Sequence, residues 1–77
     1  MIIEGFAFSP STLEISGPTE VTITNNDSTT HTFTLDDESV DETVAAGASV
    51  TVTLDLSEST GYFCRPHPSM TGTIEVV

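Results

Sequence analysis

Short runs in which apolar and polar residues alternate fill most of this chain, and they constrain its fold more than any other feature. Alternation with a period of two is typical of a β-strand with one buried face, whereas an amphipathic helix needs apolar residues every three or four positions. No segment shows a convincing helical period. The runs that predict strands are residues 12–16, 20–25, 32–35, 49–55, 61–64 and 71–77. The chain is therefore predicted to be all-β.

Turn-forming residues separate these runs. They occur at residues 9–11, 17–18, 25–28, 45–47 and 57–61. Short strands with such breaks indicate an antiparallel β-sandwich or barrel, here of about seven to eight strands. Residues 2–8 are read as one further strand, bulged at Gly5, and the acidic residues 36–43 as an irregular loop. With no internal repeat or linker, residues 1–77 are expected to form a single domain.

The length of the chain favours a bound metal. A chain of 77 residues buries only a modest core, and domains of this size often depend on a metal or a disulfide. A disulfide within the chain is impossible because Cys64 is the only cysteine. A metal is therefore favoured as the stabilising element.

The charge balance excludes several functions. Twelve acidic residues stand against one basic residue, Arg65, which gives a formal net charge of -11. Nucleic acids and anionic membrane surfaces would repel such a chain, because binding them needs clustered Lys or Arg. The acidic excess either steers a basic partner or reflects a generally acidic surface, as in proteins from salty environments. No apolar run is long enough for a transmembrane helix, and no signal peptide is recognisable.

Four soft metal ligands form the main functional motif. Cys64, His67 and Met70 follow one another in the spacing Cys-x-x-His-x-x-Met, and His31 lies upstream at the start of another predicted strand. Each residue alone is weak evidence, because single Cys, His and Met residues are usually structural. Together they form the donor set of a blue-copper site, a trigonal plane of two His and one Cys with a weak axial Met.

The surroundings of these residues suit electron transfer. Pro66 and Pro68 flank His67 and restrict the loop, so both oxidation states would share one geometry. Thr32 is expected to offer its backbone N–H to the Cys64 sulfur. Arg65 would either orient a docking partner or offset local acidity.

The chain resembles the cupredoxins, in particular the small plastocyanin and amicyanin type. The matching segments are residues 6–10, 21–31, 45–47 and 61–72, and the short loop Cys-x-Pro-His-Pro-x-Met is the most specific of them. The resemblance implies a Greek-key β-sandwich with one type 1 copper held by His31, Cys64, His67 and Met70. It also implies an exposed edge of His67, ringed by Pro66, Pro68, Phe8 and Met70, and a location outside the cytoplasm. Many relatives carry Asn after the first histidine, where this chain has Thr32.

The leading functional hypothesis is a one-electron carrier with a Cu(I)/Cu(II) site, a monomer that docks a redox protein partner near His67. Two alternatives remain open: a copper-binding module for storage or delivery, and a cupredoxin domain cut from a larger redox protein. Zinc also suits His and thiolate ligands. We expect no enzymatic activity, because four ligands leave no open position and no further histidine remains as a base.

Overall fold

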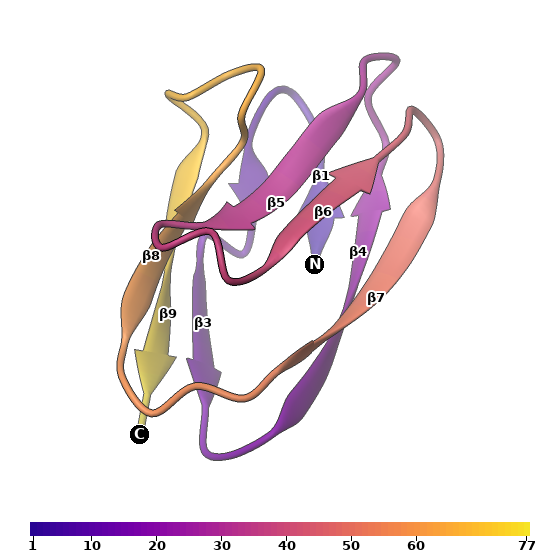
Figure 1. Ribbon diagram of the computed structural model, residues 1–77. Coiled ribbons are helices and arrows are strands. Elements are labelled where there is room, and N and C mark those ends of the chain that lie inside the picture. Colours follow the sequence, from indigo (N-terminus) through magenta and orange to yellow (C-terminus); the bar gives the residue numbers. More distant parts are fainter.

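The computed structural model describes residues 1–77 as a two-layer β-sandwich with no helix (Figure 1). The strands are β1 (Ile2–Ile3), β2 (Phe8–Ser9), β3 (Thr12–Ile15), β4 (Thr19–Asn25), β5 (His31–Leu35), β6 (Asp41–Val44), β7 (Ser49–Leu54), β8 (Thr60–Phe63) and β9 (Thr71–Val76). One sheet has the order β2-β1-β4-β7 and the other the order β3-β9-β8-β5-β6. The predicted all-β sandwich is confirmed. Most neighbouring strands are antiparallel, and the pairs β1–β4 and β3–β9 are parallel.

The core lies between the two sheets and collects the inward residues of the alternating runs. In β4 and β7, Ile23, Val52 and Leu54 are buried while their neighbours face outward, as the period of two requires. Strand β5 is different, because all five of its residues are buried. Phe33 and Leu35 belong to the apolar core, and His31 and Thr32 contact Cys64, the residue that follows β8. This strand therefore links the core to the candidate site.

Two predicted segments differ in the structure. Residues 2–8 do not form one bulged strand, because Glu4 N–H donates to the Ala7 carbonyl (3.0 Å) and closes a hairpin between β1 and β2. The acidic segment 36–43 is not wholly irregular, because its last residues form the edge strand β6. Val44 of β6 is fully buried and pairs with His31. Exposed Asp41 and Glu42 place charges on the edge, where they discourage further strand pairing.

Tyr62 fixes the beginning of β9 beneath the Cys64–Met70 loop. Its buried ring packs against Phe8 and Phe33, and its hydroxyl donates to the Ser11 carbonyl (2.9 Å). Burial raises the pKa of Tyr62 to about 12. Strands β8 and β9, which carry the two ends of the loop, are thereby tied to the segment before β3.

Three loops meet at one end of the sandwich, at the top of Figure 1: the β1–β2, β4–β5 and β8–β9 connections. The four predicted metal ligands lie on the last two of these loops or directly beside them. No helix of the structure could span a membrane.

Candidate metal centre

His31, Cys64 and His67 come together at this end of the sandwich although the first two are 33 positions apart in the chain. His31 is the first residue of β5, Cys64 directly follows β8, and His67 lies in the loop after it. The Cys64 Sγ atom lies 3.5 Å from His31 Nδ1 and 3.9 Å from His67 Nδ1. One donor atom from each residue falls within 4.8 Å of the others. Cys64 and His31 are fully buried, and His67 is partly exposed.

The spacing of the three donors fits a single metal ion. Bonds of about 2.0–2.3 Å from a metal to imidazole nitrogen or thiolate sulfur place three donors of a trigonal plane about 3.5–4.0 Å apart. Both distances from the sulfur fall in this interval. One thiolate and two imidazoles are also the donors that the trigonal plane of a blue-copper site requires. The residues present therefore fit copper.

Met70 closes the loop that carries Cys64 and His67. Cys64 N–H donates to the Met70 carbonyl (3.1 Å), and Met70 N–H donates to the His67 carbonyl (2.9 Å). His67 N–H in turn donates to the Cys64 carbonyl (3.2 Å). Met70 is buried in the same cluster as Cys64. Three backbone hydrogen bonds and two prolines thus hold the loop in one shape.

Thr32 contacts the cysteine in two ways. Its backbone N–H donates to Cys64 Sγ (3.4 Å), as the sequence predicted. Its hydroxyl oxygen accepts a hydrogen bond from the Arg65 N–H (2.9 Å). The Thr32 side chain therefore ties β5 to the residue after the cysteine.

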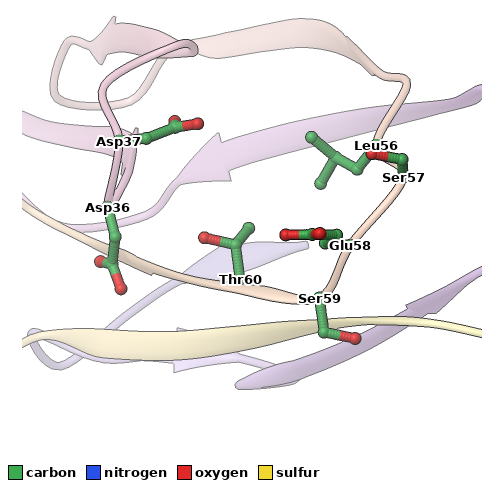
Figure 2. A pocket seen from close by; sticks show the side chains of 7 residues that line it. All are labelled: Asp36, Asp37, Leu56, Ser57, Glu58, Ser59 and Thr60. Atoms are coloured by element: carbon green, nitrogen blue, oxygen red, sulfur yellow. The ribbon is translucent and has the colours of Figure 1, made fainter.

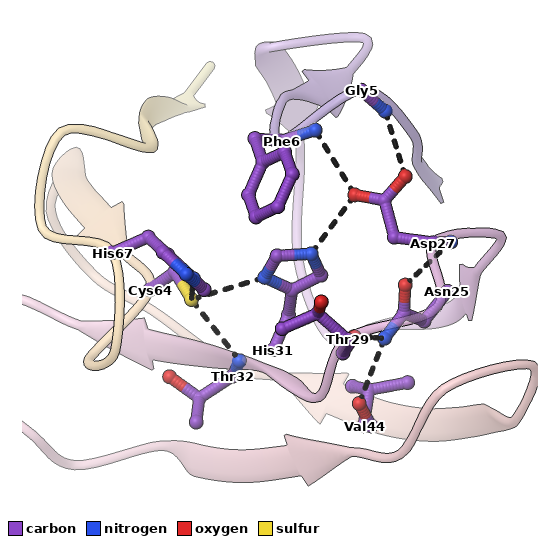
Figure 3. A network of polar contacts seen from close by, with 10 residues as sticks. All are labelled: Gly5, Phe6, Asn25, Asp27, Thr29, His31, Thr32, Val44, Cys64 and His67. Atoms are coloured by element: carbon purple, nitrogen blue, oxygen red, sulfur yellow. Dashed lines mark hydrogen bonds and ion pairs between the residues drawn. The ribbon is translucent and has the colours of Figure 1, made fainter.

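Asp27 orients His31 from the side away from Cys64 (Figure 3). Its Oδ2 atom lies 2.9 Å from His31 Nε2. Hydrogen bonds from the Phe6 and Gly5 N–H groups and from His31 lower the pKa of Asp27, so its carboxylate is ionised and accepts the Nε2 proton. The other ring nitrogen, His31 Nδ1, faces the Cys64 sulfur at 3.5 Å. The sequence analysis missed Asp27, because an acidic residue in a turn carries no distinctive pattern.

The aromatic residue at the site is Phe6, which corrects the predicted surroundings of His67. Phe8 and Met70 do not ring the exposed imidazole edge, because both are buried in the core. The Phe6 ring is 52% exposed. Its centroid lies 5.3 Å from the His31 ring and 4.9 Å from the His67 ring, with edge-to-face geometry at both.

Comparison with known families agrees with this geometry. Residues 2–77 match the family model described as copper binding proteins, plastocyanin/azurin family. The chain belongs to this family of copper-binding proteins. The cupredoxin resemblance of the sequence is thereby confirmed, and so is copper as the metal that its site takes. No curated protein sequence matches the chain significantly.

Solved structures share the cupredoxin fold. A purple cupredoxin from Nitrosopumilus maritimus superimposes with a TM-score of 0.85 at 25% identity, over 99% of this chain and 96% of that one. Amicyanin from Paracoccus versutus gives a TM-score of 0.82 at 22% identity, over 99% and 77% of the two chains. A copper-containing nitrite reductase from Thermus scotoductus gives 0.80 at 26% identity, and this cupredoxin covers 21% of that chain.

Arg65 of this cupredoxin is paired with acidic side chains. Its guanidinium donates hydrogen bonds to the carboxylates of Glu38 and Asp41. One guanidinium nitrogen lies 3.1 Å from Asp41 Oδ2. Arg65 and the Thr34 hydroxyl together lower the pKa of Asp41. Of the two readings of Arg65, the structure supports compensation of local acidity. The ion pair with Asp41 also links β6 to the loop that carries Cys64 and His67.

A separate pocket of about 460 Å³ lies at the opposite end of β5 and β8 (Figure 2). Its lining residues are Asp36, Asp37, Leu56, Ser57, Glu58, Ser59 and Thr60. Only Leu56 is apolar, so the pocket is an acidic depression, unlike the mostly apolar pockets that bind organic ligands. It contains none of the predicted metal ligands.

Proposed function

We propose that this cupredoxin binds one type 1 copper through His31, Cys64, His67 and Met70, and that it shuttles single electrons. The observation that carries the proposal is the buried Cys64 sulfur with two imidazole nitrogens at 3.5 and 3.9 Å. Met70, in the same loop, supplies the fourth donor. Its thioether would be the weak donor that distinguishes blue-copper sites from other His and Cys sites.

Copper bound there supplies a one-electron Cu(II)/Cu(I) couple. The protein contributes a donor set that is already in position. The Thr32 N–H fixes the Cys64 sulfur, Asp27 fixes the His31 ring, and the loop hydrogen bonds fix His67. Because each donor is held by a second contact, little needs to move when the charge changes. Fully buried Cys64 and His31 keep water from these two donors.

The exposed edge of His67 is the proposed electron port. His67 is partly exposed between the exposed Pro66 and Pro68, and the half-exposed Phe6 ring borders it. This makes a small surface with an apolar rim around a metal ligand. Electron-transfer complexes bury little area, so such a surface is sufficient for a transient redox partner protein.

We further propose that the chain acts as a monomer outside the cytoplasm and without catalytic activity of its own. The chain contains two histidines, and both belong to the proposed ligand set. None remains to act as a base or to bind a second metal. The location rests on the family resemblance alone.

A titration with Cu(II) followed by ascorbate tests the proposal. We expect an intense visible band from thiolate-to-copper charge transfer, which ascorbate bleaches and air restores. The C64S variant should remain colourless, and M70L should keep the band and change the reduction potential, because the axial ligand tunes that potential. A stable copper complex without reversible reduction would instead indicate storage or delivery.

The nitrite reductase match supports a second candidate. A domain of similar fold forms about a fifth of that enzyme's chain, so this cupredoxin could pass electrons inside a larger redox assembly. Rapid electron exchange with freely diffusing redox proteins favours the carrier. Exchange that requires a stable complex favours the domain of an assembly.

A further inference from the structure

The turn between β1 and β2 has an unusual conformation next to the metal centre. Gly5 and Phe6, its two central residues, both have positive φ, 63° and 58°. This is the backbone of a type I′ hairpin turn, in which both central residues are left-handed. Glycine accepts that conformation without cost, but a bulky residue such as Phe adopts it only when surrounding contacts enforce it. A contact that enforces the Phe6 conformation must therefore be present.

The Asp27 carboxylate provides that contact. Oδ1 accepts a hydrogen bond from the Gly5 N–H (2.8 Å), and Oδ2 accepts one from the Phe6 N–H (3.0 Å). The same Oδ2 lies 2.9 Å from His31 Nε2. Figure 3 shows the carboxylate between the turn and the imidazole. One side chain from the β4–β5 loop thus holds two turn amides and one metal-ligand ring.

The result is the placement of an aromatic ring over the site. With its backbone fixed in this way, Phe6 sets its ring against both imidazoles, which are themselves 5.1 Å apart between centroids. An unconstrained Phe in an exposed turn would not be confined to this position. Placing the Phe6 ring over the two histidines would explain why the turn keeps this strained backbone.

We propose that Asp27 is a positioning residue that couples the Gly5–Phe6 turn to the metal centre. It keeps the His31 Nε2 proton in place, so that Nδ1 faces the metal, and it holds the Phe6 ring over His31 and His67. This proposal rests on the proposed ligand set, because its effect on metal binding acts through His31. The geometry of the turn and of Phe6 does not depend on electron transfer.

NMR of the Zn(II)-loaded protein tests the coupling without any redox step. In wild type, the His31 Nε2 proton should give a slowly exchanging downfield signal, and the Phe6 ring should show NOEs to both imidazoles. In D27A, that signal should move upfield, the NOEs should weaken, and the Gly5 and Phe6 amide hydrogens should exchange at least about tenfold faster. D55A is the matched control, because it removes the same charge from an exposed position directly after β7.

Copper binding supplies the second measurement. Loss of the partner of a ligand imidazole typically weakens metal affinity by about 10–100-fold, so Cu(II) affinity should fall by about tenfold or more in D27A and stay within about twofold in D55A. The proposal is overturned if D27A matches D55A in the signals and in affinity. It is also overturned if wild type lacks the Phe6 NOEs, which requires no variant. A wild type with the predicted signals but no reversible copper couple would refute the electron-transfer function and leave the role of Asp27 standing.

Discussion

Gly72, the second residue of β9, lies directly against the ring of Tyr62 on β8. A Cβ atom at Gly72 would meet the Tyr62 ring, its hydroxyl and the Ser11 carbonyl oxygen. Tyr62 cannot yield, because it is buried between Phe8 and Phe33 and hydrogen bonded to Ser11. Because Gly72 has no side chain, β9 can lie against the Tyr62 ring directly after the loop that carries Cys64, His67 and Met70.

The substitution G72A should destabilise the fold by about 3 kcal/mol, because an added methyl group in a filled space forces backbone and ring to shift. Guanidinium unfolding of the zinc-loaded protein measures the free energy of unfolding. T73A, at an exposed position of the same strand, is the control and should cost less than about 1 kcal/mol. Equal stability of the two variants would mean that the Tyr62 ring is not fixed.

The buried Tyr62 hydroxyl should make the protein lose stability in alkali. Burial raises its pKa from the usual 10 to about 12, so between these pH values the unfolded chain releases a proton that the folded chain retains. The contribution is complete below pH 10, falls as pH rises, and is lost by about pH 12, a decrease of roughly 2–3 kcal/mol. The chain has one tyrosine and no lysine, so few other groups contribute in this range.

Y62F isolates this effect. At pH 8 it should cost about 1 kcal/mol through the lost hydrogen bond to Ser11, and between pH 10 and 12 its free energy of unfolding should decline less than that of wild type. Denaturant unfolding across this range is the measurement. Parallel pH profiles for the two proteins would argue against a retained proton on Tyr62.

The sequence predicted the longer strands and the clustering of Cys64 with the two histidines because both leave local signals. The alternation in β4 and β7 follows directly from one buried face, and the spacing of Cys64, His67 and Met70 is confined to one short loop. It did not predict the hairpin at Gly5 and Phe6, because a Phe in a left-handed conformation violates the usual turn preferences. Strand β6 was missed because it is an edge strand whose exposed acidic residues are typical of a loop.

The contacts around the ligands could not be read from the sequence for a different reason. Asp27, Phe6 and Arg65 act through partners that only the sheet arrangement brings close: Asp27 reaches Gly5 and Phe6 across 21 to 22 residues, and Arg65 reaches Glu38 and Asp41 across 24 to 27. An acidic residue in a turn and an exposed Phe have no distinctive pattern. The fold therefore had to be known before these contacts could be assigned.

Thr32 gives a prediction about the metal loop itself. Its hydroxyl accepts from the Arg65 N–H and shares a hydrogen bond with Thr34. T32V keeps the shape but leaves the Arg65 N–H without its acceptor, so we expect a loss of about 1–3 kcal/mol in unfolding free energy. T32S retains the hydroxyl and should restore most of the loss. The copper band of T32V should persist, because the bond to the sulfur comes from the Thr32 backbone; a colourless T32V that T32S also fails to restore would contradict this role.

Asn25 organises the loop that presents both Asp27 and His31. Its buried side-chain amide donates to the Thr29 carbonyl (2.8 Å) and the Val44 carbonyl (3.0 Å), and its oxygen accepts from the Asp27 N–H (2.9 Å). N25A removes all three bonds from a fully buried position. Since each buried group left unpaired costs about 1–3 kcal/mol, we expect a loss of at least about 3 kcal/mol in unfolding free energy and weaker Cu(II) binding.

The neighbouring Asn26 supplies the control for this last prediction. Its side chain is exposed, so N26A should change stability by no more than about 0.5 kcal/mol and leave copper affinity unchanged. Denaturant unfolding and competition with a copper chelator measure the two quantities on the same samples. If N25A lost stability but bound copper as tightly as N26A, the position of His31 would have to be set by β5 alone, independently of the loop before it.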